Sequence, residues 1–154
     1  MPVELQKILP QSRIDAMRAG GFWPDILVTD ALDKVLAARP DNIAVTGFNS
    51  MRQRRESLSW RQLDILSRRI GLGLAHYGVG KGDMVSMQLP NWWEFVALHL
   101  ACVRIGAITN PIMPIFRERE LSFMLPFAES RVIFVPREFR GFDHAARRAV
   151  LGDG

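Results

Sequence analysis

The feature that most constrains this chain is residues 58–114, where helix-like and strand-like segments alternate with turn residues at short intervals. Ser59 and Gln62 have the spacing of a capping box, in which each side chain bonds a backbone N–H left unpaired at a helix start. Apolar residues then recur at helical spacing until Gly78, where a left-handed residue is expected. Residues 84–89 form an apolar run with little polar alternation. This run predicts a strand buried on both faces.

A second helix and further strands follow in the same rhythm. Pro90 ends the strand, and the spacing of Asn91 and Glu94 predicts that Asn91 caps a helix over residues 92–105, which Gly106 ends. Later segments predict strands at 107–109 and 132–135 and helices at 117–125, ended by Pro126, and at 142–151. Short connections of this kind imply right-handed crossovers. The predicted fold class is therefore α/β, with a mostly parallel sheet and helices on both faces.

The first 28 residues are interpreted as a lead-in to this fold, and residues 29–154 as part of a larger domain. A short helix is predicted over residues 12–19, and glycines stop it. Phe22 and Trp23 follow directly, and such a pair is expected to anchor the helix end to the core.

The domain portion begins with a helix, a strand and a polar connection. Thr29 is expected to cap a helix that Pro40 ends, and residues 43–46 predict a strand. The connection over residues 49–57 is either a hairpin or an elongated loop.

Charge and composition exclude several classes of function. The net charge of +4 arises from 20 basic and 16 acidic residues spread along the chain. The densest basic cluster, residues 52–55 (RQRR), lacks interleaved aromatics, so it is interpreted as a solvated loop and no nucleic-acid partner is expected. No apolar stretch approaches the roughly 20 residues that span a bilayer. The cytoplasm is the expected compartment.

Neither the cysteine nor the histidines predict a reactive or metal-binding site. Cys102 is the single cysteine of the sequence and lies in an apolar helical pattern, which favours a buried thiol over a nucleophile. His76, His99 and His144 show no metal-ligand spacing.

Ligands of parallel α/β sheets bind beyond the carboxyl ends of the strands, here the loops around residues 90–91, 110–116 and 136–141. None of these loops contains GxxxxGK[ST] or GxGxxG. Lys81, in GVGKG, lies at the opposite end and is interpreted as a turn residue.

Four other residues lie near the expected ligand edge. Trp92 and Trp93 are candidates for an acyl pocket, but a core role is favoured for at least one of them. Pro111 and Pro114 fix a loop that could shape a pocket without doing chemistry. No catalytic, cofactor-binding or metal-binding residue is assigned.

The ordered segments SWRQLD (59–64), GVGKGD (78–83), LPNWWEF (89–95) and RIGAITNPIMP (104–114) carry a resemblance to a known family. Together they resemble the amino-terminal portion of the adenylate-forming acyl-CoA synthetases, the AMP-binding family. The segments at 19–25 (AGGFWPD) and 110–125 are most similar to the branch that activates medium-chain or alicyclic acids, such as cyclohexanecarboxylate-CoA ligase.

The resemblance implies that ATP and a carboxylate form an acyl-adenylate, from which coenzyme A then displaces AMP. It implies a large amino-terminal domain followed by a mobile lid. It also implies that the phosphate loop, the magnesium-binding glutamate and the lid lysine follow position 154. ATP, magnesium and coenzyme A are therefore expected for the full-length family, and none is expected to bind this chain alone.

Three hypotheses follow. The leading one is an amino-terminal fragment of an acyl-CoA ligase, inactive alone, whose carboxylic acid the sequence does not name. The second is a scaffold or interaction subunit that completes a synthetase with a partner chain. The third is an autonomous small-ligand-binding domain with a pocket near Trp92 and Pro111.

Overall fold

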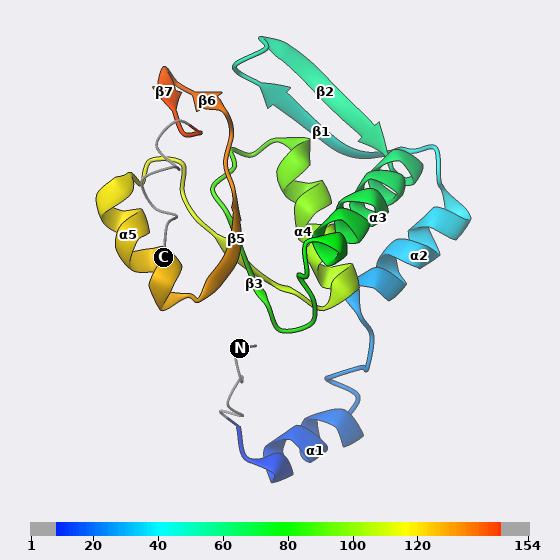
Figure 1. Cartoon of the computed structure of the whole chain (residues 1–154). Coiled ribbons are helices and arrows are strands. Elements are labelled where there is room, and N and C mark those ends of the chain that lie inside the picture. Colours follow the sequence, from blue (N-terminus) through cyan, green and yellow to red (C-terminus); the bar gives the residue numbers. More distant parts are fainter. Residues whose placement is uncertain (1–8, 146–154) are drawn as a thin grey trace.

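A computed structural model of the chain describes residues 9–145. Its centre is a parallel sheet of three strands in the order β4-β3-β5. The strands are β3 (Met84–Met87), β4 (Ile108–Pro111) and β5 (Ser130–Phe134). Figure 1 shows helices α3 (Trp60–His76) and α4 (Trp93–Ile105) on one side of this sheet and α5 (Glu118–Phe127) on the other. The predicted α/β class, with a parallel sheet and helices on both faces, is confirmed.

Two antiparallel hairpins accompany the sheet. The remaining elements are α1 (Gln11–Ala19), α2 (Val28–Ala38), β1 (Ile43–Asn49), β2 (Arg54–Ser59), β6 (Glu138–Phe139) and β7 (Phe142–Asp143). Strands β1 and β2 pair with each other, which decides the open question about residues 49–57 in favour of the hairpin. Strands β6 and β7 form the second, very short hairpin.

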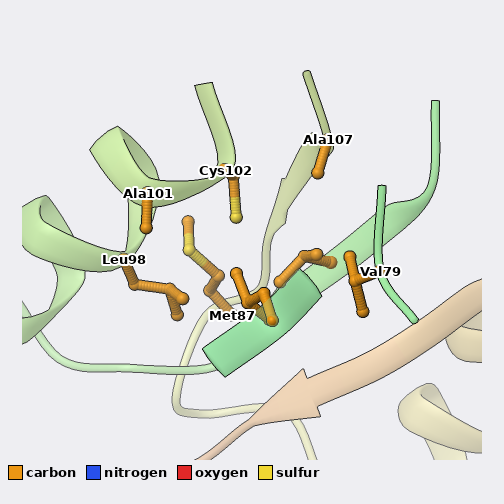
Figure 2. Close-up of a cluster of buried hydrophobic side chains, with 8 residues drawn as sticks. Val79, Met87, Leu98, Ala101, Cys102 and Ala107 are labelled. Carbon is orange, nitrogen blue, oxygen red and sulfur yellow. The ribbon is translucent and has the colours of Figure 1, made fainter. Parts of the chain in front are cut away.

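The main core lies between the sheet and the α3–α4 pair. Val85 and Met87 of β3 are fully buried and pack against Leu98, Ala101 and Cys102 of α4. Figure 2 shows several of these side chains converging on Met87. A second cluster, Leu32, Leu63, Ala97 and Leu100, joins α2 to α3 and α4. Helix α4 therefore contributes to both clusters, as expected from its apolar sequence.

Helix α3 begins and ends as the sequence predicts. The Ser59 hydroxyl accepts from the Gln62 backbone N–H at 3.3 Å, and the Gln62 side-chain oxygen accepts from the Ser59 backbone N–H at 2.9 Å. Gly78 follows the helix with φ of 76°, and Gly106 ends α4 with φ of 73°. Both positions use the left-handed conformation that glycine adopts without steric cost.

The starts of helices α2 and α4 differ from the predictions. Helix α2 begins at Val28, so Thr29 lies inside its first turn, and the Asp30 carboxylate accepts from the Leu27 N–H at 2.9 Å. Helix α4 begins after Trp92, and no side chain caps it. Asn91 is exposed and is not a cap. Asn91 and Glu94 have the spacing of a capping box, but the backbone does not place the Asn91 side chain where it can bond the start of the helix.

Two predictions near the end of the described region also need correction. Pro126 lies within the last turn of α5, which continues to Phe127, so it does not end the helix. Phe142 and Asp143 form β7 by pairing with Phe139 and Glu138, where a helix was expected to begin. The rest of that predicted helix, beyond residue 145, lies outside the described residues.

The expected aromatic anchor of the lead-in is not formed. Phe22 is 72% exposed, and Trp23 is also exposed. The Phe22 ring lies over Gly20, where a Cβ would be only 2.7 Å away. Helix α1 itself has no buried residue, and Figure 1 shows it apart from the helices that cover the sheet. Its only large apolar residues are Ile14 and Met17, too few to form a docking face.

An ion pair between Asp64 of α3 and Arg104 of α4 lies beside the core. The two side chains are only 16% and 13% exposed, and Arg104 Nε also donates to the Ser67 hydroxyl at 3.1 Å. Asp64 accepts a further bond from Arg68. The charges are thus paired and hydrogen-bonded, as partly buried charges require.

We expect Ser59→Ala to lower the free energy of unfolding by about 1 kcal/mol, because the Gln62 N–H loses its cap. Asn91→Ala is the matched control and should change the free energy by less than about 0.5 kcal/mol. Urea denaturation of the 154-residue chain measures both. Equal losses in the two variants would contradict the cap assignment.

We expect Asp64→Ala to cost about 3 kcal/mol, because it leaves the Arg104 guanidinium buried without a counter-charge. Asp41→Ala removes the solvent-exposed pair with Arg61 and should cost much less, because exposed ion pairs are screened by water. Circular dichroism across a denaturant gradient compares the two. A cost for Asp64→Ala no larger than that of Asp41→Ala would show that the interhelical pair is not a structural constraint.

Candidate functional site

The candidate site is a cleft of about 570 Å³ between helix α5 and the sheet. Its walls combine apolar residues of α5 and β5 with polar residues at the carboxyl end of β3 and in the β6–β7 hairpin. The lining residues include Gln88, Arg117, Leu125, Ile133, Val135 and His144. We call this space the α5 cleft.

Alternation along the strands decides which residues face the cleft. Val132 and Phe134 of β5 pack into the α3–α4 core. Ile133 and Val135 therefore face the opposite side, toward α5, because successive side chains point to opposite faces of a sheet. From the helix, Leu121 lines the same space. The cleft walls therefore include apolar side chains from both the strand and the helix.

Gln88 lies at the polar end of the cleft and is fully buried. Its side-chain Nε2 donates to the carbonyl of Met113 at 3.1 Å and to that of Phe116 at 2.8 Å. These two bonds fasten the loop after β4 to the end of β3. The other side-chain atom, Oε1, is buried and has no hydrogen-bond partner among the described residues.

His144 is the second residue of the cleft with an unpaired buried atom. Its side chain is almost fully buried, and Nε2 has no partner among the residues from 9 to 145. Burial lowers the pKa of His144, and the nearby Arg117 charge lowers it further. The imidazole is therefore neutral at pH 7.

Arg117 brings a positive charge to the same end of the cleft. Its guanidinium lies 4.0 Å from the centre of the Phe142 ring and donates to the carbonyls of Pro114 and Phe116. Phe142 in turn contacts the His144 ring edge-on, with the ring centres 4.8 Å apart. The polar end thus combines one cation, one neutral imidazole and one free amide oxygen.

A hydroxyl pair lies beside the cleft on the same face of the sheet. The Ser86 and Ser130 hydroxyls are 2.6 Å apart, and Asn110 Nδ2 donates to the Ser86 hydroxyl at 3.0 Å. The partners of the Ser86 hydroxyl are thus a second hydroxyl and an amide. An amide cannot take a proton from a hydroxyl, so the group links the three strands and does not form an activated nucleophile.

The residues that the sequence suggested for a pocket or a ligand contact lie in several separate places. Lys81 is in the turn before β3, with its side chain against Gly106, at the opposite end of the strand from Gln88. Trp92 contacts Phe139 edge-on, and Trp93 packs on the second core cluster. Neither tryptophan lines the α5 cleft.

The two prolines and the basic cluster are not part of the cleft either. Pro111 is exposed at the end of β4, and Pro114 accepts from Arg117. Arg52 and Arg54 both bond the Glu56 carboxylate and lie in the β1–β2 hairpin.

The histidines do not converge. His99 Nδ1 lies 3.2 Å from the Thr109 hydroxyl, and among residues 9–145 there is no group of three or more metal-ligating side chains. Glu94 Oε2 is buried and has no partner within residues 9–145, and burial raises the pKa of this carboxyl.

The importance of Gln88 was missed from the sequence, although a signal was present. Val85, Ser86, Met87 and Gln88 alternate between apolar and polar, a period of two that was obscured by the apolar residues around it. Both faces are buried as predicted, but the face toward α5 is polar at Ser86 and Gln88.

Cys102 is a buried thiol, as predicted. It is fully buried in the main core, and burial raises its pKa to about 11. Figure 2 places it among Met87, Leu98 and Ala101.

We expect Cys102 to react with a maleimide or an aromatic disulfide only when the chain unfolds, because the thiolate is the reactive species. Labelling in native buffer should be at least about a hundredfold slower than in denaturant. Mass spectrometry after timed quenching measures both rates. Fast labelling of the native chain would show that the main core is open.

Comparison with known proteins decides the family. Residues 32–153 match the model of the AMP-binding enzyme family. The chain belongs to that family. The resemblance drawn from the sequence is thereby confirmed.

The relatives of this AMP-binding enzyme chain include ligases of several acids. The chain is 32% identical over 130 residues to the medium-chain fatty-acid–CoA ligase of Escherichia coli, and the match covers 84% of this chain and 22% of the relative. It is 33% identical over 137 residues to a salicylyl-CoA synthase / salicylate adenylyltransferase of Streptomyces, covering 89% and 24%. The chain thus spans about a quarter of the length of these relatives.

Solved structures agree with the fold. The apo structure of MbtA from Mycobacterium smegmatis matches with a TM-score of 0.69 and 31% identity, covering 81% of this chain and 23% of that one. The crystal structure of VinN matches with a TM-score of 0.70 at 23% identity, covering 83% and 32%, and supports the fold alone. Among the described residues, no helix is both long enough and apolar enough to cross a membrane.

Proposed function

We propose that this chain provides the first part of the large domain of an ATP-dependent acid–CoA ligase. In this reaction a carboxylate attacks ATP to give an acyl-adenylate and pyrophosphate, and coenzyme A then displaces AMP. The observation that carries the proposal is the family match over residues 32–153. The proposed compartment is the cytoplasm, which a single, buried cysteine supports.

The proposed substrate is a medium-chain or alicyclic carboxylic acid. The E. coli relative, whose name gives medium-chain fatty acids as its substrate, supports this choice. Other relatives are named for salicylate and 2,3-dihydroxybenzoate, so the activation of a carboxylate is common to the group.

The role proposed for these 154 residues is that of a scaffold that does not turn over nucleotide by itself. The sequence contains neither GxxxxGK[ST] nor GxGxxG. Among the described residues, no cluster of three or more His, Cys, Asp or Glu side chains is placed to hold a metal ion. Without donors for the triphosphate, the charge that develops in the transition state has no stabiliser. What the chain contributes is a rigid sheet and the loop after β4, which Gln88 fixes in place.

A chimera tests this proposal. The 154-residue chain replaces the matching first portion of the E. coli medium-chain ligase, and carboxylate-dependent exchange of pyrophosphate into ATP is measured. We expect exchange from the chimera and none from the 154-residue chain alone. Exchange by the isolated chain, or silence from a folded chimera, would refute the proposal.

A matched pair of variants controls for the scaffold role. Leu63→Asp places a charge in the second core cluster and should abolish exchange by the chimera. Ile65→Asp makes the same kind of change at an exposed position of the same helix and should keep the activity of the chimera. Equal activities of the two variants would argue against a structural contribution from α3.

The second candidate function is an interaction subunit that completes a synthetase with a partner chain. The open α5 cleft favours it, because its apolar walls and unpaired polar atoms match a protein surface that another segment covers. The third hypothesis, a ligand pocket near Trp92 and Pro111, has less support, since neither residue lines the cleft.

A further inference from the structure

The loop over residues 112–117, here called the β4–α5 loop, leaves the sheet at the end where ligands of parallel α/β sheets bind. The Ile112 N–H donates to the Met87 carbonyl at 2.9 Å, so the loop starts beside the carboxyl end of β3. Pro111 and Pro114 restrict its backbone, as was expected from the sequence. The loop is therefore placed to meet a ligand.

Side chains from two directions hold the backbone of this loop. From the end of β3, Gln88 Nε2 donates to the carbonyls of Met113 and Phe116, at 3.1 and 2.8 Å. From the start of α5, Arg117 Nη1 donates to the carbonyls of Pro114 and Phe116, at 2.6 and 3.0 Å. The Phe116 N–H also donates to the Met113 carbonyl at 3.1 Å, which closes a turn. The loop is thus fixed in one conformation.

Two apolar side chains of the same loop are turned outward. Met113 is 57% exposed, and Ile115 is 71% exposed. On a loop with a free backbone, such side chains would have to be ordered before they could hold a ligand, and this ordering costs binding free energy. The bonds to the loop carbonyls reduce that cost. The loop therefore presents a preformed apolar contact at the ligand edge of the sheet.

Gln88 and Ser86 lie on the same face of the sheet but bond different parts of the molecule. The Ser86 hydroxyl bonds Ser130 and Asn110, so it links neighbouring strands. The Gln88 donors go to the β4–α5 loop, and its Oε1 is buried with no partner in the region from 9 to 145. An unpaired buried acceptor costs stability. Gln88 thus fixes the loop at a cost to the core, and such local conflicts are expected at functional sites.

We propose that Gln88 is a positioning residue of the ligase reaction, which holds the β4–α5 loop so that Met113 and Ile115 contact a substrate. The inference rests on the proposed function, because it takes the substrates from that reaction. The chemistry that the loop recognises is an apolar surface. Such a surface is offered by the hydrocarbon part of the acid and by the flat face of a purine base, and the kinetic test below distinguishes these two sources.

Hydrogen exchange in the 154-residue chain tests the first half of the inference, the hold on the loop. Gln88→Met keeps a long side chain and removes both donors. We expect the Phe116 amide to exchange at least about tenfold faster in this variant, because the turn then opens more often. Ser86→Ala is the matched control on the same face and should leave this amide unchanged. Equal exchange of the Phe116 amide in Gln88→Met and the parent chain would overturn the inference.

Steady-state kinetics of the chimera with the E. coli ligase tests the second half, the contact with a substrate. We expect Gln88→Met to raise the KM for one substrate about tenfold and to change kcat by less than about twofold, because binding and not the chemical step is affected. A rise for octanoate assigns the loop to the hydrocarbon, and a rise for ATP or coenzyme A assigns it to the purine. Either result supports the inference.

The failures of the inference and of the proposed function are distinguishable in this assay. Unchanged KM values for all three substrates in an active Gln88→Met chimera would overturn the inference and leave the proposed function intact. A folded parent chimera without activity would refute the proposed function and the inference with it. If Gln88→Met does not fold, Gln88→Asn takes its place, since it keeps a polar amide but is too short to reach both carbonyls. The same outcomes then apply.

A second pair of variants tests the outward side chains themselves. Ile115→Ser should raise the same KM as Gln88→Met. Leu72→Ser on α3 is the matched control and should not, because Leu72 is 72% exposed and Ile115 71%. The double variant Gln88→Met/Ile115→Ser should raise the KM by less than the product of the two single effects, because both act through one contact. Equal KM values for Ile115→Ser and Leu72→Ser would overturn the inference.

Discussion

The fold depends on the burial of β3 on both of its faces. Val85 and Met87 enter the apolar core formed with α3 and α4, and Ser86 and Gln88 are equally buried on the opposite face. A strand in this position must satisfy both faces at once, apolar surface on one and hydrogen bonds on the other. The neighbouring strands supply the bonds to Ser86, through Ser130 and Asn110.

The two faces of the sheet are covered very differently, and this asymmetry explains the position of the candidate site. On one face, α3 and α4 are joined by a shared core and by the Asp64–Arg104 ion pair, so there is little room for another segment. On the other face, α5 stands off the sheet and leaves the cleft. Gln88 connects the sheet to helix α5, since its backbone belongs to the sheet and its side chain fixes the loop that leads to α5.

The scaffold role that we propose is consistent with membership of the AMP-binding enzyme family. The residues that the structure describes position loops and present an edge and a cleft, whereas the chemistry of adenylation needs donors for a triphosphate. A parallel sheet places its ligand-binding loops at one edge, and the strands that carry those loops need neighbours before the site is complete.

The sequence by itself determined the elements whose signals are local. The capping box at Ser59, the left-handed turn at Gly78 and the helix end at Gly106 were predicted, because each depends on neighbours within a few residues. The parallel α/β class was predicted from the alternation of helical and strand segments. Only the tertiary structure decided that Asn91 does not cap its helix and that Phe22 stays exposed. It also decided that Gln88 and His144 line the same cleft, since this cleft arises from packing between segments far apart in the chain, which no local pattern encodes.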